Sequence, residues 1–227
     1  STLEHAISAR NGQQMSKELM DSATCMGYSP LHMCAKGPRA LAGASASLVA
    51  EEGAAKILAL LLEAKANVNA RSSSGETPLL TLVRSQVWSS TGLVQLMRIL
   101  LVGKADVSAA EDVVGETPLM RTARRGNAAG CCFLLDARAD VAQKNLHGHT
   151  AACLARDSGH KAAARLISRY GDLAAGGQKE AVSAGDHKPG WRDLKLTDGD
   201  AELAEELAEE RPHKLGTWDA LLLTIEH

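Results

Sequence analysis

A short pattern around a proline recurs along this chain and constrains its fold more than any other feature. Three copies join a hydroxyl residue, a proline and a leucine, and a fourth keeps the threonine alone; they begin at Ser29, Thr77, Thr117 and Thr150. The last two copies are 33 residues apart, whereas the earlier intervals are 48 and 40 residues. A recurring unit of this length is typical of a solenoid, in which each unit is completed by its neighbours.

Each copy carries residues that start a helix. The hydroxyl of Thr77 or Thr117 can cap a helix N-terminus, and the proline that follows lacks only an N–H that would have no partner there. Leu79 and Leu82 then supply an apolar stripe, and residues 57–61 supply another for a second helix. Because neither helix can bury its stripe alone, the sequence predicts an all-α stack of helix pairs.

The unit resembles the ankyrin-repeat family in both halves, since its second half returns as ANVN, ADVS and ADVA from Ala66, Ala105 and Ala139. The resemblance implies a β-turn finger and two antiparallel helices per unit, which makes an ankyrin-repeat solenoid. We therefore divide the chain into an N-terminal capping helix pair at 1–26, four repeats at 27–171, a linker at 172–190 and an acidic C-terminal tail at 191–227 with one or two short helices.

The two long intervals place insertions between the helices of the first two repeats. The first lies near 38–52, with a short helix of its own, before the second helix begins afresh at Gly53. The other lies near 85–91 and includes Trp88, and the next finger gains one residue around 111–114. Insertions of this kind either serve a function or are tolerated as surface loops.

The second helices end on unusual residues. Where the family usually has a left-handed glycine, this chain has Lys65, Lys104 and Arg138, and only the fourth unit keeps its glycine, Gly171. A side chain in that conformation costs about 1 kcal/mol, which is partly offset by placing a cation at the negative end of a helix. We expect these three residues to have a positive φ.

No motif in the sequence predicts catalysis, a cofactor or a metal, so we expect a protein that is not an enzyme. His147 and His149 lack a third ligand at metal-binding spacing, and no nucleophile elbow, phosphate loop or dinucleotide fingerprint is present. His32 stands at the family's histidine position, which implies a structural hydrogen bond. Cys131 and Cys132 follow the register of a helix flank.

Composition limits the compartment and the classes of partner. No run approaches the roughly 18 apolar residues of a membrane span, and five cysteines without a C-x-x-C pair indicate a reducing, intracellular compartment. The cytoplasm is the default. The repeat sequences LLEAKANVNA and LLDARADVA are similar to those of ankyrin proteins in photosynthetic protists. The alternative compartment is therefore the chloroplast, reached after removal of a targeting segment. The basic cluster lacks stacking aromatics, which argues against nucleic acid.

The charge of the chain divides at the end of the repeats. Residues 1–171 hold 19 Lys and Arg against 14 Asp and Glu, while residues 172–227 hold 6 against 13. The acidic tail therefore docks either on its own repeats, with Trp191 and Trp218 as apolar anchors, or on a separate partner.

Ankyrin-like units present finger tips and inner-helix side chains to other proteins, so we predict a non-catalytic interaction scaffold or assembly element. The alternative is a stoichiometric structural subunit of a large complex, including an organellar photosynthetic one, held by the insertions and the tail. Arg84, Arg121 and Arg124 would grip acidic groups. Val113 and Val114 would form an apolar finger anchor beside Trp88, unless Trp88 covers its own hairpin. The candidate partner-binding residues are Arg71, Glu76, Arg84, Trp88, Val113, Val114, Arg121, Arg124, Lys144, His147, Trp191 and Trp218.

Overall fold

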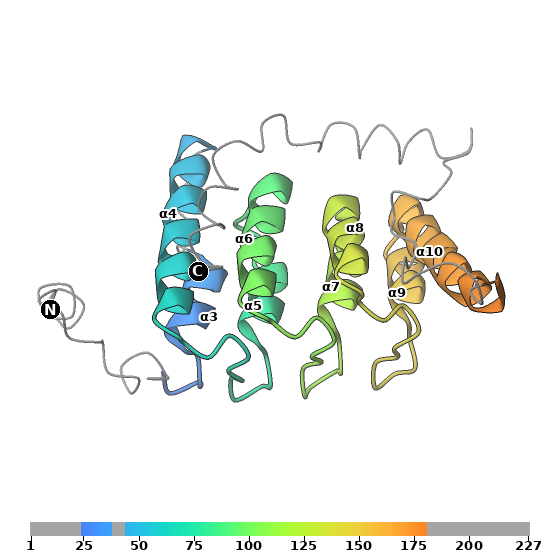
Figure 1. The fold of residues 1–227 in the computed structure, drawn as a ribbon, viewed down its shortest axis with the longest axis horizontal. Helices are drawn as coiled ribbons and strands as arrows, with labels where there is room; N and C mark the ends of the chain where they lie inside the picture. The colour runs from blue at the N-terminus through green and yellow to red at the C-terminus, as the bar shows by residue number, and fades with distance from the viewer. Residues whose placement is uncertain (1–23, 38–43, 181–227) are drawn as a thin grey trace, which may run out of the picture.

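The computed structural model describes residues 24–37 and 44–180, which form a row of helix pairs with loops along one edge (Figure 1). The helices are α3 (Pro30–Lys36), α4 (Ala44–Glu63), α5 (Pro78–Arg84), α6 (Ser90–Val102), α7 (Pro118–Arg124), α8 (Ala128–Asp136), α9 (Ala151–Asp157) and α10 (Lys161–Glu180). No strand occurs in the described ranges. The all-α repeat solenoid predicted from the sequence is confirmed. The capping pair, most of the linker, and the tail with Trp191 and Trp218 lie outside the described residues.

The short helices begin where the hydroxyl residues predict. The side-chain oxygens of Thr77, Thr117 and Thr150 each accept a hydrogen bond from a backbone N–H three residues later. Ser29 forms a capping box with His32, the third residue of α3. Each finger therefore becomes a helix at a fixed residue, which keeps the four inner helices in the same register.

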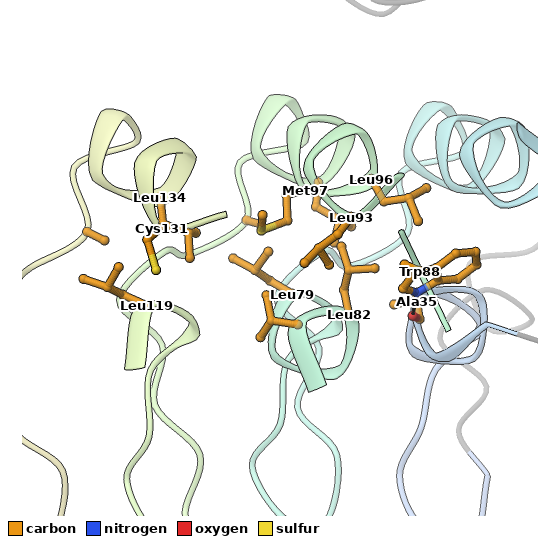
Figure 2. Packing of buried hydrophobic residues seen from close by; sticks show 14 of the residues in the cluster. Ala35, Leu79, Leu82, Trp88, Leu93, Leu96, Met97, Leu119, Cys131 and Leu134 are labelled. Carbon is orange, nitrogen blue, oxygen red and sulfur yellow. Dashed lines mark hydrogen bonds between the residues drawn. The ribbon is translucent and has the colours of Figure 1, made fainter. Parts of the chain in front are cut away.

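The helix pairs pack into two layers, with α3, α5, α7 and α9 on one side and α4, α6, α8 and α10 on the other (Figure 1). Side chains from the two layers point toward one another and form the core, as Figure 2 shows for Leu119 with Cys131 and for Leu79 with Met97. Cys131 and Cys132 are buried in this core on α8, as the register of their helix predicts.

The three cationic helix ends adopt the expected left-handed conformation, with φ values of 60° at Lys65, 66° at Lys104 and 65° at Arg138. At each end, the N–H of the cationic residue bonds a carbonyl three residues back, and the next N–H bonds one five residues back. This pair of bonds satisfies the last helix carbonyls and requires the left-handed residue. Gly171 is different, because α10 continues through it to Glu180, so the prediction of a helix end there is wrong.

The described part of the first insertion extends a helix and does not form one of its own. Helix α4 is continuous from Ala44, so the predicted fresh start at Gly53 is wrong. Near the junction, the Glu51 carboxylate accepts a hydrogen bond of 2.9 Å from the backbone N–H of Ser89, the residue that caps α6. The negative charge of Glu51 at the N-terminus of α6 stabilises α6.

The fingers show the predicted extra residue. In two of them, a backbone N–H bonds the carbonyl four residues ahead, from Ser72 to Glu76 and from Asn145 to His149. In the finger between them, the bond spans five residues, from Glu111 to Glu116. The longer turn confirms the extra residue expected at 111–114.

We expect Lys104→Gly to raise the free energy of unfolding by about 0.5–1 kcal/mol, because glycine removes the cost of a side chain at positive φ. Urea denaturation measures the change. Lys56→Gly, at an exposed position inside α4, is the matched control and should lower stability by about 1 kcal/mol. A similar loss in both variants would contradict the assignment of strain to Lys104.

Candidate functional site

A buried arginine joins the inner helices to the fingers. The guanidinium of Arg121 on α7 lies 3.0 Å from Glu76, 2.5 Å from Glu111 and 3.4 Å from Glu116, measured between nitrogen and carboxylate oxygen. The side chain of Arg121 is 8% exposed and the three carboxylates are buried. One cation on an inner helix thus gathers three anions from two successive fingers.

Two further arginines complete the charge balance at the solvent edge of this cluster. Arg84 lies 2.8 Å from Glu76, and Arg124 lies 3.1 Å from Glu116; both arginines are exposed. The Tyr28 hydroxyl donates a hydrogen bond of 3.3 Å to Glu76. Three arginines therefore face three glutamates, and their formal charges cancel.

Glu76 keeps its negative charge despite its burial. Burial by itself would raise the pKa of this carboxyl, but the hydrogen bonds and charges of Arg84 and Arg121 outweigh burial, and the net pKa is lowered. The backbone carbonyl of Glu76 accepts a further hydrogen bond of 2.8 Å from Nε2 of His32, whose Nδ1 accepts from Ser29. Burial lowers the pKa of His32, which favours the neutral ring that these bonds require. The structural role predicted for His32 is confirmed.

This cluster contradicts the prediction that the arginines of the inner helices are free to bind acidic groups of a partner. Glu76 and Arg121 are buried, so their side chains do not face a partner, and the expectation for these two residues is wrong. Arg84 and Arg124 are exposed but already paired with carboxylates of their own chain. The reason is local, since the two middle fingers supply a glutamate, Glu76 or Glu116, directly before the threonine that starts an inner helix.

Trp88 is also turned inward. It is buried, and its indole N–H donates a hydrogen bond of 2.8 Å to the carbonyl of Ala35 on α3 (Figure 2). Any side chain at Gly37 would collide with the Trp88 ring, and the φ of Gly37 is 79°. The inserted loop thus places its tryptophan against α3 of the preceding repeat, so the prediction that Trp88 anchors a partner is wrong. The alternative expectation, that Trp88 covers its own hairpin, did not place the ring on the neighbouring repeat.

The finger tips present the exposed apolar side chains. Val113 is 67% exposed and Leu146, on the next finger, is 71% exposed. Val114 is half-buried, and its carbonyl accepts a hydrogen bond of 2.9 Å from the N–H of Leu146, which fixes the two fingers side by side. The sequence prediction named both valines but missed Leu146, although the same signal, an apolar residue at a finger tip, marks it.

Three other predicted residues lie at the same edge. Lys144 and His147 are exposed on the finger that carries Leu146. Arg71 is exposed and forms an ion pair of 2.7 Å with Asp112, beside Val113 on the neighbouring finger. Their partner-binding role stays a prediction, but the edge that they share is continuous with Val113 and Leu146.

The described residues contain neither a cluster of metal ligands nor a helix that could span a membrane. Within residues 24–37 and 44–180, no three His, Cys, Asp or Glu residues gather as metal ligands would. The rings of His147 and His149 are tilted, with centroids 6.5 Å apart. None of the described helices is long and apolar enough to cross a membrane.

Comparison with known proteins gives one finding that bears on this geometry. The family model of the ankyrin repeat matches residues 114–146, a stretch that runs from one finger tip to the next and includes α7 and α8. A search of curated proteins returns no match.

We expect Arg121→Met to lower the free energy of unfolding by about 3–5 kcal/mol at neutral pH, because it leaves three buried carboxylates without their central cation. Arg124→Met, which removes an exposed member of the same cluster, should cost less than about 1 kcal/mol. Urea denaturation of both variants makes the comparison. The loss in Arg121→Met should shrink as the pH falls from the ordinary glutamate range through the lowered pKa of Glu76, because that carboxyl then loses the charge that Arg121 stabilises. Equal, small losses at neutral pH would show that Arg121 does not hold the cluster together.

We expect Trp88→Ala to lower the free energy of unfolding by about 3–5 kcal/mol, because a large buried ring and its hydrogen bond to Ala35 are both lost. Val87→Ala, at the exposed neighbouring position, should change stability by less than about 0.5 kcal/mol. Thermal unfolding compares the two. If the two variants melted together, Trp88 would not be a core residue.

Proposed function

Because this chain is an ankyrin-repeat protein, we propose that it binds a partner protein through its finger tips, with Val113 and Leu146 at the centre of the contact. The family makes protein interaction the general expectation. The observation that carries this choice of surface is the pair of apolar side chains exposed on adjacent fingers. Large apolar side chains held at the surface are typical of contact sites, especially when polar residues surround them.

The backbone of the finger edge supports a preorganised contact. Neighbouring fingers are tied by hydrogen bonds from Ser73 to Met26, from Asp112 to Ser74 and from Leu146 to Val114. Each bond runs from a backbone N–H in one finger to a carbonyl in the preceding one. A partner that binds a surface ordered in advance loses less conformational freedom of the protein on association.

Polar groups around Val113 and Leu146 define the rim. Lys144 and His147 flank Leu146, while the Arg71–Asp112 ion pair lies beside Val113. We infer that the partner presents an apolar side chain to the two finger tips and hydrogen-bonding groups to this rim. Such an arrangement of an apolar centre and a polar rim is common in protein interfaces.

The charge cluster gives less support to an acidic partner bound by Arg84, Arg121 and Arg124. Arg121 is enclosed by its three glutamates, and the two exposed arginines are each neutralised by one of them. An acidic partner would have to compete with carboxylates that are already desolvated and in place. The finger edge requires no such exchange.

The alternative function, a structural subunit held by its insertions and tail, divides into two parts. The described insertion residues Glu51, Trp88 and Ser89 contact other parts of this chain, which leaves fewer groups for an assembly. The role of the tail at 191–227 stays a prediction. We therefore favour the fingers.

We expect the double substitution Val113→Asp and Leu146→Asp to weaken partner binding at least about tenfold, equivalent to about 1.4 kcal/mol, because two charges replace the apolar centre. The measurement is affinity capture from the native source, followed by titration of each captured protein against the purified chain. Proteins that bind the unmodified chain should be lost from the double variant.

Val87→Asp is the matched control, since Val87 is an exposed valine away from the finger tips. It should retain the partners that the double variant loses, and both variants should unfold like the unmodified chain. Partners that bind the double variant as tightly as the unmodified chain would exclude the finger tips as the contact.

A further inference from the structure

We propose that residues 1–23 of this chain cover an exposed apolar face on helix α4, the face that carries Ile57 and Leu60. These residues are 52% and 56% exposed and lie one turn apart on the same side of the helix. A side chain at Gly53, one turn earlier, would meet no other atom, so the open surface continues along the helix. Large aliphatic side chains on a packed helix point to a missing neighbour.

Equivalent positions in the other repeats are covered. Ile57 and Leu60 stand eight and five residues before the left-handed Lys65. Counting back in the same way from Lys104 gives Leu96 and Ile99 on α6, from Arg138 gives Gly130 and Phe133 on α8, and from Gly171 gives Ala163 and Leu166 on α10. Five of these six residues are buried, and Phe133 is half-buried and packs against the core. The exposure in α4 is therefore a property of its place in the stack and not of the position in the repeat.

The missing neighbour lies on the N-terminal side. Helix α4 already packs on α3 of its own repeat and on α6 of the following one. Helix α10 is the last outer helix described, yet its Ala163 and Leu166 are buried, with α8 of the preceding repeat packed against it. What α4 lacks, among the described residues, is an outer helix from a preceding repeat.

The opposite end of the described stack is finished differently. Cys132 and Leu135 of α8 are buried, while the equivalent positions of α10, counted back from Gly171, are Arg165 and Ser168, which are exposed. Terminal repeats of a solenoid need a polar outer face. The last described repeat has one, and the first described repeat does not, so within the described stack the uncovered apolar face lies at the N-terminal end.

Chain connectivity indicates which segment covers the face of Ile57 and Leu60. The turn at Thr24 forms the first finger of the row, because Thr24 N–H bonds the Tyr28 carbonyl and Ser73 N–H bonds the Met26 carbonyl. In each later repeat, the segment that leads into a finger is an outer helix, such as α4 before the finger at 72–76. Residues 1–23 lead into the first finger and are thus tethered next to the face of Ile57 and Leu60.

The sequence of this segment fits the role. It carries two apolar pairs at four-residue spacing, Leu3 with Ile7 and Met15 with Leu19, separated by polar residues and by Asn11-Gly12. Residues four apart lie on the same side of a helix, so each pair gives one short helix an apolar face. We assign this face to the contact with α4.

A photo-crosslinking amino acid, benzoylphenylalanine, placed at position 57 of the full chain tests the occupant. We expect cross-links within one chain to peptides from residues 1–23, identified by mass spectrometry. The same probe at the exposed Glu52, off the Ile57–Leu60 side of α4, should give at most a tenth of that yield. Cross-links only between two copies of the chain, none to residues 1–23, or equal yields from both positions would overturn the proposal.

Hydrogen exchange gives a second readout that does not alter α4 itself. Replacing Leu3, Ile7, Met15 and Leu19 with serine should speed amide exchange in residues 57–61 at least about tenfold and leave the exchange of α8 unchanged. The control variant, Gln13→Ser with Gln14→Ser, should exchange like the unmodified chain. Identical exchange of residues 57–61 in all three proteins would show that residues 1–23 do not cover this face.

Discussion

Every described repeat depends on a neighbour to complete its interior, and this requirement determines the rest of the structure. The inner helices are short, with 7 residues each, so a single helix pair offers too little apolar surface to be stable alone. The chain supplements burial with polar contacts that cross from one repeat to the next, such as the bond from His32 to the Glu76 carbonyl. These bonds are made in a dry interior, where the direction of a hydrogen bond fixes the register that aliphatic packing leaves loose.

The same requirement explains where a partner can bind. The glutamates that precede the starts of α5 and α7, Glu76 and Glu116, are buried. Burial of a negative charge requires a cation beside it. Arg121 supplies that cation from the inner helix and is thereby withdrawn from the surface. The side chains at the finger tips need no such pairing, because the hydrogen bonds between fingers are made by backbone groups. Their side chains, including Val113 and Leu146, are left for contacts with another molecule.

The sequence predicted backbone conformation correctly where a single residue determines it. It did not predict the burial of a side chain where that burial depends on contact between two distant segments. The caps at Thr77 and Thr117 and the positive φ of Lys104 follow from local chemistry, which a sequence displays directly. The burial of Arg121 and Trp88 depends on what the neighbouring repeat places beside them. Leu146 was missed for a simpler reason, since the rule applied to the valines of one finger was not carried to the next.

The two insertions show how such pairs of segments arise. Extending α4 at its N-terminus leaves Glu51 beside the start of α6, and the longer loop that precedes α6 brings the N–H of Ser89 to that carboxylate. The same loop places Trp88 against α3 of the first repeat. A buried charge added alone would be costly, but the Glu51 carboxylate and the Ser89 N–H satisfy each other across the boundary between repeats, and the Trp88 ring is covered by α3. A stack that adds surplus residues in neighbouring repeats can therefore gain cohesion from them, because contact between adjacent units is the only kind that a solenoid allows.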